Sequence, residues 1–397
     1  MSHPDHIDEN AGDPARRLCV MQLVPRLESG GVERGAIEIV RALTRAGHRA
    51  LIVSAGGRME PQLRRAGGEL IRMEIGAKSP FAMRRNARAL TRLIAEHEVD
   101  ILHARSRAPA WAGWFAARAT GCRFITTYHG VYGEDFPLKR QYNSVMAMGD
   151  PVIAVSNHVA EVVAERHKVP ETRIVTIPRG ADIHSFAEEA VSSERTISLA
   201  QAWGVIEDPR PIVLLPGRLT RLKGNEDVIA AMKLLRDRDP EGFDVQLVIV
   251  GDDSGSGFAA TLEQAVRAAR LEGSVRMVGH CADMEAAYKL SAVVVSASRY
   301  PEAFGRVAVE AQAMGRPVIA TAHGGSLETV ADGETGWLYP PGDVEALADA
   351  IGKAIALDES ARAHMGLAAR ARIRSRFTIE QMQDATLRVY ERDEASV

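Results

Sequence analysis

Short apolar runs alternate with longer amphipathic stretches along most of this 397-residue chain, and this alternation restricts the fold more than any other feature. In the first half the runs are LCVMQLV, ALIVS, DILHA, RFITTY, PVIAVS and RIVTI, and after a polar stretch over 187–210 they resume as PIVLLPG, DVQLVIVGD, VRMVGH, AVVVSAS and PVIAT. Runs of this length and composition are typical of strands buried on both faces of a parallel sheet, with helices between them. The sequence therefore predicts an α/β protein built from doubly wound, Rossmann-like sheets.

The length of the chain favours two domains, because 397 residues exceed what one hydrophobic core usually serves. We place the boundary in the polar stretch. We expect an N-terminal domain over 18–195, a C-terminal domain over 205–377 and a last helical segment over 378–397, with Thr378 as its N-cap. Ligands of open α/β sheets bind at the carboxyl ends of the strands, so two such domains facing each other predict a central binding cleft.

Charge and cysteine content exclude several classes of protein. A formal net charge of -3 gives no reason to expect a nucleic-acid-binding protein. Cys19, Cys122 and Cys281 are widely spaced and lack a partner at metal-ligand spacing, which is typical of a reducing compartment. Residues 1–17 are acidic and lack the apolar centre of a signal peptide, so we expect a disordered tail there. No apolar run approaches the ~20 residues of a membrane span, and a cytoplasmic protein is predicted.

The stretch SASRYPEAFGRVAVEAQAMGRPVIAT, residues 296–321, combines strand, loop and helix signals. The apolar runs at its ends predict strands, and Gly305 to Met314 predicts a helix between them. A helix that begins just after the carboxyl end of a strand presents unpaired backbone N–H groups and the positive end of its dipole. We therefore expect the amides of Phe304, Gly305 and Arg306 to bind an anion.

Two glutamates flank this expected anion site. Glu302 stands in the loop before the helix, and Glu310 lies five residues beyond Gly305, which is roughly 7.5 Å deeper at the α-helical rise. One carboxylate can accept hydrogen bonds from sugar hydroxyls near a phosphate while the other reaches a ribose diol, so the pair predicts a site for a phosphorylated sugar donor. The alternative is structural, with Glu302 as a charge at a helix start and Glu310 as a solvated residue.

Two cations and two glycines follow other predicted strands. Arg218 and Lys223 lie just after PIVLLPG, where they would neutralise the charge that builds on a departing diphosphate. Loop cations are usually solvated, but their combination with the glutamates favours the site. Gly30 and Gly31 follow the first strand and precede a helix, and glycine lets a ligand approach the backbone closely. A bare strand-to-helix turn is the alternative for these glycines.

These motifs resemble those of the retaining GT-B glycosyltransferases of family 4, in the family's order and over nearly the whole chain from Leu18 onward. Glu302 and Glu310 match the E-x7-E signature of that family. LLPGRLTRLKG resembles its diphosphate clamp, GGSLETVADGETGWLYPPGD its segment after the second strand of the signature, and ESGGVERGAIEIVRAL its opening glycine loop and first helix. Two positions depart from the pattern: Arg179 stands where the family usually has Asn, and Ala303 where it usually has Gly.

The resemblance implies a GT-B fold of two Rossmann-like domains and an activity. A sugar would move from a nucleotide diphosphate donor to a hydroxyl acceptor held by the first domain, with retention of configuration and without a metal, in cell-envelope glycan or glycolipid synthesis. The resemblance implies that Glu302 contacts the donor sugar, Glu310 the ribose, Gly31 a donor phosphate and His129 the reacting sugar. It also implies that the last helix crosses back to the first domain. His129 follows the predicted strand RFITTY, and a histidine at such a position is more often a structural residue than a catalyst, which is the alternative.

Several details stay open at this point. Val278 and Gly279 are expected to offer backbone groups to the nucleobase, but the sequence specifies neither base, sugar nor acceptor. Residues 237–239 spell DRD, which in another glycosyltransferase fold binds a metal, but here they read as a solvated helix end, so we expect no metal cofactor. Alternative functions on the same architecture are a sugar-nucleotide epimerase or hydrolase and a non-catalytic sugar-nucleotide-binding protein.

One predicted helix, FAMRRNARALTRLIAEHEVD, carries four arginines on one broad face. They are Arg84, Arg85, Arg88 and Arg92. Such a face suits anionic lipid headgroups or an anionic acceptor, which predicts a peripheral contact with the inner membrane. A solvated charged face is the alternative.

Overall fold

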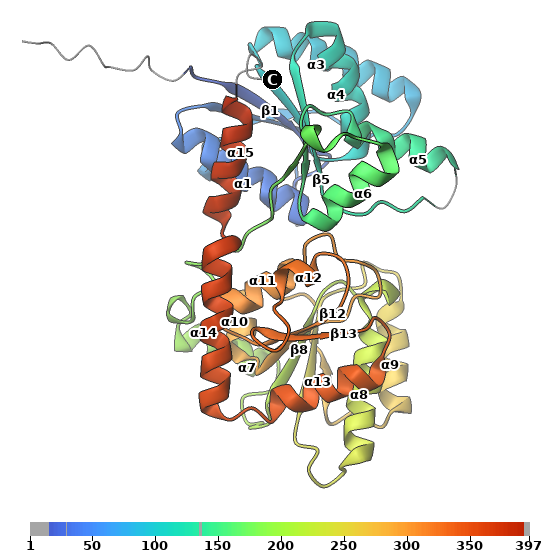
Figure 1. Ribbon diagram of the computed structural model, residues 1–397, viewed down its shortest axis with the longest axis vertical. Coiled ribbons are helices and arrows are strands. Elements are labelled where there is room, and N and C mark those ends of the chain that lie inside the picture. Colours follow the sequence, from blue (N-terminus) through green and yellow to red (C-terminus); the bar gives the residue numbers. More distant parts are fainter. Residues whose placement is uncertain (1–15, 29, 135–136, 393–397) are drawn as a thin grey trace, which may run out of the picture. The chain divides into compact units, whose positions relative to one another are not determined.

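The computed structural model describes residues 16–28, 30–134 and 137–392 (Figure 1). The chain divides into two compact units. Unit 1 consists of the described residues of Met1–Thr127, Arg140–Val152 and Tyr390–Val397, and unit 2 consists of those of Tyr128–Lys139 and Ile153–Val389. The predicted disordered tail covers 1–17, and its residues 1–15 lie outside the described part of the chain.

The first sheet has seven strands in the order β3-β2-β1-β4-β5-β6-β7. Its strands are β1 (Cys19–Leu23), β2 (Arg49–Ser54), β3 (Glu69–Arg72), β4 (Ile101–Ala104), β5 (Arg123–Tyr128), β6 (Val152–Ala154) and β7 (Ile174–Thr176). β1 pairs in parallel with β2 and β4, with Val20 opposite both Ala50 and Ile101. All five residues of β1 are buried, as its central place in the sheet requires.

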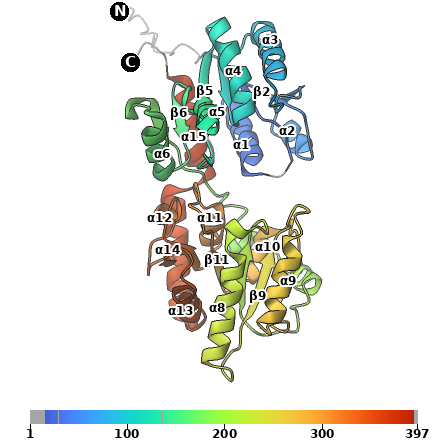
Figure 2. The same cartoon turned by 90° about the vertical axis from the view of Figure 1, so that its right-hand side faces the viewer.

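The helices that alternate with these strands follow the predicted order. They are α1 (Gly31–Arg45), α2 (Glu60–Arg65), α3 (Pro80–Glu96), α4 (Arg107–Thr120), α5 (Pro137–Asn143) and α6 (Asn157–His167), with 3-10 turns η1 (Ser144–Ala147) and η2 (Glu171–Arg173). In unit 1, α3 and α4 pack against each other, and both views show them side by side (Figure 2). Ser79 is the N-cap of α3, and its side chain accepts a hydrogen bond from the Ala82 amide at 3.2 Å.

The second sheet lies within unit 2 and has six parallel strands in the order β10-β9-β8-β11-β12-β13. They are β8 (Ile212–Pro216), β9 (Gln246–Val250), β10 (Val275–Met277), β11 (Val293–Ser296), β12 (Val318–Thr321) and β13 (Gly336–Tyr339). The order reverses at β8, which pairs with β9 on one side and with β11 on the other. In such sheets this reversal marks the crevice at the carboxyl ends of the strands where ligands bind.

The helices of this part of the chain include those that cover both faces of the second sheet. They are α7 (Ser193–Ala202), α8 (Asn225–Arg238), α9 (Phe258–Ala268), α10 (Met284–Leu290), α11 (Arg306–Ala313), α12 (Ser326–Thr329), α13 (Val344–Ile355) and α14 (Glu359–Arg376), with 3-10 turns η3 (Glu188–Ala190) and η4 (Arg221–Lys223). Alternate strand residues such as Val213, Leu247 and Ile319 pack with α8, α9 and α13 in one core cluster. α10 and α11 pack on the sheet from its other face (Figure 1).

Two strands escape sequence prediction, and both lie at sheet edges. β3 ends the first sheet, and none of its four residues is buried. β13 ends the second sheet, and its two middle residues are only half-buried. An edge strand has a neighbour on one side only and can be partly exposed, so its apolar pattern is often weaker, although the edge strands β7 and β10 were predicted. α7 is also unpredicted, since it lies in the polar stretch over 187–210.

The last helix, α15 (Ile379–Glu391), begins with the predicted N-cap. The Thr378 hydroxyl accepts a hydrogen bond from the Gln381 amide, and the Gln381 side chain accepts one from the Thr378 amide, each at 3.1 Å. This reciprocal pair is a capping box. At the other end of the helix, within unit 1, the Tyr390 hydroxyl lies 2.6 Å from Nδ1 of His103 on β4. Arg123 at the start of β5 donates to the Tyr390 carbonyl at 3.0 Å.

No helix among the described residues is both long enough and apolar enough to cross a lipid bilayer.

Candidate active site

The loop between β11 and α11 carries Glu302, and its geometry follows the predicted pattern of strand, loop and helix. α11 begins at Arg306, one residue later than predicted, because Gly305 is its N-cap and adopts the left-handed backbone, with φ of 88°. That conformation is easy only for glycine. The side chain of Phe304 is buried and packs edge-on against Phe377 at 5.6 Å, so only its backbone amide is suited to a ligand. The predicted anion site therefore depends on the backbone amides at the start of α11, and it stays a prediction.

An ion pair joins Glu302 to Lys223, which ends the η4 turn after β8. The Lys223 ammonium and the Ser298 hydroxyl both donate to the same oxygen of Glu302, Oε1. Burial would raise the pKa of Glu302, but the Lys223 charge and the hydrogen bonds from Lys223 and Ser298 lower it below the usual value. Within the described residues, Oε2 of Glu302 has no hydrogen-bond partner, so this oxygen can accept one from a ligand.

Close backbone contact fixes the two loops that meet in this ion pair. Gly224 follows Lys223 with φ of 67°, and a Cβ added there would lie 1.9 Å from the carbonyl oxygen of Ala297. The Arg299 amide donates to the Leu222 carbonyl at 2.9 Å. These contacts hold Lys223 against the Glu302 loop, so a larger residue at Gly224 would separate them.

Arg218, the second predicted cation, is exposed in the loop after β8. Its side chain forms no ion pair or hydrogen bond with any other residue that the structure describes. It therefore remains an uncompensated positive charge near the carboxyl edge of the second sheet. This position suits binding of an anionic group. The two cations therefore differ, because Lys223 is already paired with Glu302 whereas Arg218 is not.

Glu310 is buried on α11, only 8% exposed, so the alternative of a solvated face residue is wrong. The Tyr288 hydroxyl donates to its Oε2 at 3.1 Å, and the Arg306 guanidinium donates to its Oε1 at 3.0 Å and 3.2 Å. Tyr288 belongs to α10 and was not predicted from the sequence. A contact between Glu310 and the ribose diol of a donor stays a prediction.

The loop after β12 lies directly against the Glu302 loop. Gly324 and Glu302 form a parallel β-bridge, and the Gly325 amide donates to the Glu302 carbonyl at 2.7 Å. A Cβ added at Gly325 would lie 2.6 Å from the α-carbon of Phe304. This contact explains why two glycines follow one another here, and it places the preceding residue, His323, beside the site.

The remaining predicted residues lie in other loops at carboxyl ends of strands. Val278 and Gly279 directly follow β10, and Gly279 has a φ of 70°. Gly30 is the N-cap of α1 and Gly31 its first residue, both in unit 1. His129 directly follows β5 and is half-buried. No contact described in the structure joins these residues to Glu302, so their roles stay predictions.

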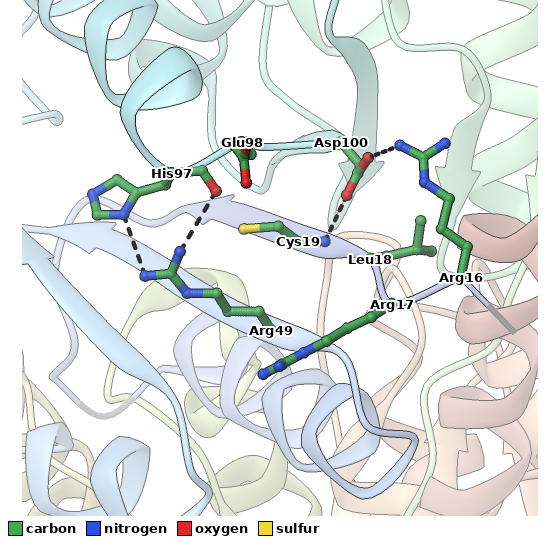
Figure 3. Close-up of a pocket in the computed structure, with 8 residues that line it drawn as sticks. All are labelled: Arg16, Arg17, Leu18, Cys19, Arg49, His97, Glu98 and Asp100. Carbon is green, nitrogen blue, oxygen red and sulfur yellow. Dashed lines mark hydrogen bonds and ion pairs between the residues drawn. The ribbon is translucent and has the colours of Figure 1, made fainter. Parts of the chain in front are cut away.

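Positive and negative charges also line a cavity of about 430 Å³ in unit 1 (Figure 3). Its lining consists of Arg16, Arg17, Leu18, Cys19, Arg49, His97, Glu98 and Asp100. Asp100 accepts hydrogen bonds from the Cys19 amide at 2.7 Å and from Arg16 at 2.5 Å. The cavity lies where β1 and β2 begin, at the amino edge of the sheet. Ligands of such sheets bind at the opposite edge, so this cavity is not the candidate active site.

Residues 237–239 end α8 as predicted. Asp237 pairs with Lys233 and with Arg236, and Asp239 accepts a hydrogen bond from the Gly242 amide at 2.9 Å. Over the part of the chain that the structure describes, no three His, Cys, Asp or Glu side chains are grouped as metal ligands.

Comparison with known proteins identifies the family of this chain. The sequence family described as Glycosyltransferase Family 4 matches residues 29–185, and the one described as Glycosyl transferases group 1 matches residues 200–372. A D-inositol 3-phosphate glycosyltransferase of Xylanimonas cellulosilytica is 30% identical over 73% of this chain and 71% of its own length. A glycosyltransferase structure from Rickettsia africae is 34% identical and superimposes with a TM-score of 0.86, covering 94% of this chain and 98% of that one.

A more distant structure has the same fold with a ligand bound. Anabaena HepE in complex with UDP superimposes with a TM-score of 0.81 at 23% identity, over 94% of this chain and 99% of that chain. The two parallel sheets, the glutamate pair of the β11–α11 segment and these relatives agree on one assignment. The chain is a glycosyltransferase and belongs to glycosyltransferase family 4 of the GT-B fold.

Proposed function

We propose that this enzyme transfers a sugar from a nucleoside diphosphate donor to an acceptor hydroxyl, with retention of anomeric configuration and without a metal ion. The observation that carries the proposal is the state of Glu302. One carboxylate oxygen is held by Lys223 and Ser298, while the other has no partner among the described residues. A carboxylate fixed in this way beside a helix start accepts a sugar hydroxyl next to a phosphate.

In this proposal the donor lies along the carboxyl edge of the second sheet. The amides that precede α11 bind the diphosphate, and Arg218 and Lys223 stabilise the charge that it gains on leaving. Glu310 binds the ribose, and backbone groups at Val278 and Gly279 bind the base. Gly30 and Gly31 add a phosphate contact.

In the transfer step the bond between the anomeric carbon and the phosphate oxygen breaks, and the acceptor oxygen bonds to that carbon on the same face. The acceptor proton passes to the leaving phosphate oxygen, so no protein base is needed. His129 contacts the reacting sugar and orients it. The positive charge for this step comes from Arg218, Lys223 and the start of α11, which is why we propose that no metal is required.

The relatives indicate which donors and acceptors to test first. HepE was crystallised with UDP and, in another structure, with UDP-glucose, so UDP sugars are the first donors to test. Relatives named D-inositol 3-phosphate glycosyltransferase make a phosphorylated polyol the first acceptor. We further propose a cytoplasmic role in the synthesis of a cell-envelope glycan or glycolipid.

A screen with the purified protein tests the function. UDP, GDP and ADP sugars are added singly, and the unfolding midpoint is measured, because a ligand that binds only the native state raises it. The stabilising donor is then incubated with and without acceptor. Transfer supports the proposal. Free sugar and free nucleotide without acceptor would indicate a hydrolase, and binding without any turnover would indicate a non-catalytic binding protein.

We also propose a peripheral contact between α3 and an anionic membrane. Arg84, Arg85, Arg88 and Arg92 are all exposed, and none forms an ion pair or hydrogen bond with a side chain in the described part of the protein. Phe81, at the start of the same helix, is 84% exposed. An exposed aromatic ring beside unpaired arginines suits a headgroup layer better than a purely solvated face.

Co-sedimentation with vesicles tests this contact. Wild type is expected to bind vesicles that contain anionic phosphatidylglycerol, to lose binding at high salt, and to ignore neutral phosphatidylcholine. Replacing the four α3 arginines by Glu is expected to abolish binding. The matched control replaces four other exposed arginines of unit 1, Arg41, Arg45, Arg64 and Arg65, by Glu. Equal loss in both variants would show that only net charge matters and that α3 is not the contact.

A further inference from the structure

His323 lies beside the candidate active site but belongs to none of the motifs that define it. It follows β12 and precedes Gly324, whose backbone bridges to Glu302. A Cβ added at Gly324 would lie 2.6 Å from the Glu302 carbonyl oxygen, so the two loops are in direct contact. The position of His323 is therefore fixed next to Glu302 by backbone contacts, and not by the direction of a flexible side chain.

The imidazole of His323 lacks hydrogen bonds although it is enclosed. Both ring nitrogens are buried, and neither has a hydrogen-bond partner among the described residues. Of the described histidines, His323 alone has both of its ring nitrogens in this state. A neutral imidazole needs one acceptor and one donor, and buried polar groups in native proteins are nearly always paired. The missing partner of such a group is often a ligand.

The neighbourhood of this ring restricts what the ligand group can be. Burial raises the pKa of Glu302, and Lys223, Ser298 and His323 are among the groups that lower it, so the imidazole lies within electrostatic reach of that carboxylate. A phosphate oxygen at this point would face the negative charge of Glu302. A sugar hydroxyl would not, because it can donate to Oε2 of Glu302 and accept from a His323 N–H at the same time.

We propose that His323 hydrogen-bonds a hydroxyl of the transferred sugar and, together with Glu302, determines which sugar the enzyme accepts. The inference rests on the proposed function, since it requires a nucleotide-sugar donor in the site of the second sheet. It goes beyond that function because it adds a group, outside the known motifs, that contacts the sugar and not the nucleotide. It also predicts that a change at His323 weakens binding of the nucleotide sugar but not of the free nucleotide. This difference in affinity can be measured without any turnover.

The test compares two ligands on four proteins by calorimetry. The ligands are the nucleotide sugar that stabilises the wild type and its free nucleoside diphosphate. The proteins are the wild type, His323→Ala, His323→Gln and the control His364→Ala, which alters an exposed histidine of α14. We expect His323→Ala to bind the nucleotide sugar about tenfold more weakly and the free diphosphate normally. His323→Gln keeps a polar group near Nε2 and is expected to regain most of the loss, and the control is expected to match the wild type.

A donor that lacks one sugar hydroxyl gives an independent measurement. If His323 binds that hydroxyl, wild type binds the deoxy donor more weakly than the full donor. His323→Ala, which already lacks this contact, binds the two donors equally. Equal weakening of both ligands in His323→Ala, or no weakening of either, would overturn the inference. If His323→Ala does not fold, His323→Gln and the deoxy donors on wild type still decide it. A wild type that binds no nucleotide sugar would instead refute the proposed function, and this inference with it.

Discussion

Lys223 and Glu302 form an ion pair at the carboxyl edge of the second sheet, although 79 residues separate them in the chain. Lys223 contacts only one oxygen of Glu302, Oε1. The ion pair joins the η4 turn to the β11–α11 loop. Arg218, in the same loop as Lys223, keeps its charge unpaired among the described residues. A leaving diphosphate would therefore meet one cation already positioned by a carboxylate and one that is free to move toward it.

Removing either cation is expected to lower turnover more than donor affinity. Lys223→Ala and Arg218→Ala should each reduce kcat roughly a hundredfold, which corresponds to ~3 kcal/mol, because the diphosphate gains its charge mainly in the transition state. Steady-state kinetics with the identified donor provide the measurement. The control is Arg221→Ala, an exposed arginine of the same turn, which should stay close to wild type. Near-normal kcat with a raised KM in both Lys223→Ala and Arg218→Ala would contradict the leaving-group role.

Glu310→Gln is expected to raise the KM for donor while changing kcat less. A ribose contact far from the reacting carbon is made about equally in the ground state and the transition state. The partners Tyr288, which is buried, and Arg306, which is half-buried, hold the carboxylate in place, which favours this role. Kinetics with ribose and deoxyribose donors test it. Wild type should prefer ribose and Glu310→Gln should not, so equal discrimination by both would remove the ribose role from Glu310.

Asp208 is expected to give a measurable contribution to stability in acid. Hydrogen bonds from Arg210 lower the pKa of Asp208 from the usual 3.8 to about 2, with Arg276 adding to the effect. A lowered pKa in the folded state stabilises the protein above about pH 3.8, and the contribution disappears as the pH falls toward 2. Asp208→Asn should therefore unfold at a lower temperature than wild type at pH 7, and the difference should shrink below pH 4.

Unfolding midpoints between pH 7 and pH 3 measure this effect. Asp349→Asn is the control, because Asp349 also pairs with an arginine, Arg238 at 2.6 Å, but its side chain is 56% exposed. Exposed pairs contribute little, so the control should follow wild type at every pH. A difference between Asp208→Asn and wild type that stays constant down to pH 3 would show that the ionised Asp208 is not the cause.

The hydroxyl of Tyr390 is expected to stabilise unit 1 against unfolding. Its hydroxyl bonds to Nδ1 of His103, and Thr127 bonds to Nε2 at 2.7 Å, all fully or almost fully buried. Tyr390→Phe removes one partner from a buried ring nitrogen, which typically costs about 1–3 kcal/mol. Urea unfolding measures the loss, with Tyr300→Phe, at a residue 66% exposed, as the control. Equal stability of the two variants would mean that the buried hydrogen bond contributes nothing.

The central elements of the fold were predictable because their signals are local. Every residue of β1 and β8 is buried and all but Gln22 are apolar, and the α11 region has a glycine at each end. β3 and β13 have no such signal, since an edge strand is partly exposed. Local pattern therefore identifies central strands more reliably than edge strands, since β7 and β10 were predicted but β3 and β13 were not.

The candidate site was predictable only in part. Lys223, Glu302 and Glu310 stand in motifs, but two neighbours of these residues, Tyr288 and His323, do not. Tyr288 lies 22 residues before Glu310 on another helix, and His323 is brought to Glu302 by backbone contact between two loops. Such partners depend on how separate segments pack, which no periodicity or spacing in a single sequence encodes.

Activity is expected to survive complete chelation of divalent ions, and the product is expected to keep the anomeric configuration of the donor. Lys223, Arg218 and the helix start at Gly305 together supply positive charge at the place where the diphosphate leaves. Glu302 is held by Lys223 and Ser298 on one oxygen and is thus suited to bind sugar hydroxyls. Assays with EDTA, and proton NMR of the fresh product, measure the two properties. An inverted anomer, or activity that returns only with magnesium or manganese, would refute the proposed mechanism and leave the family assignment intact.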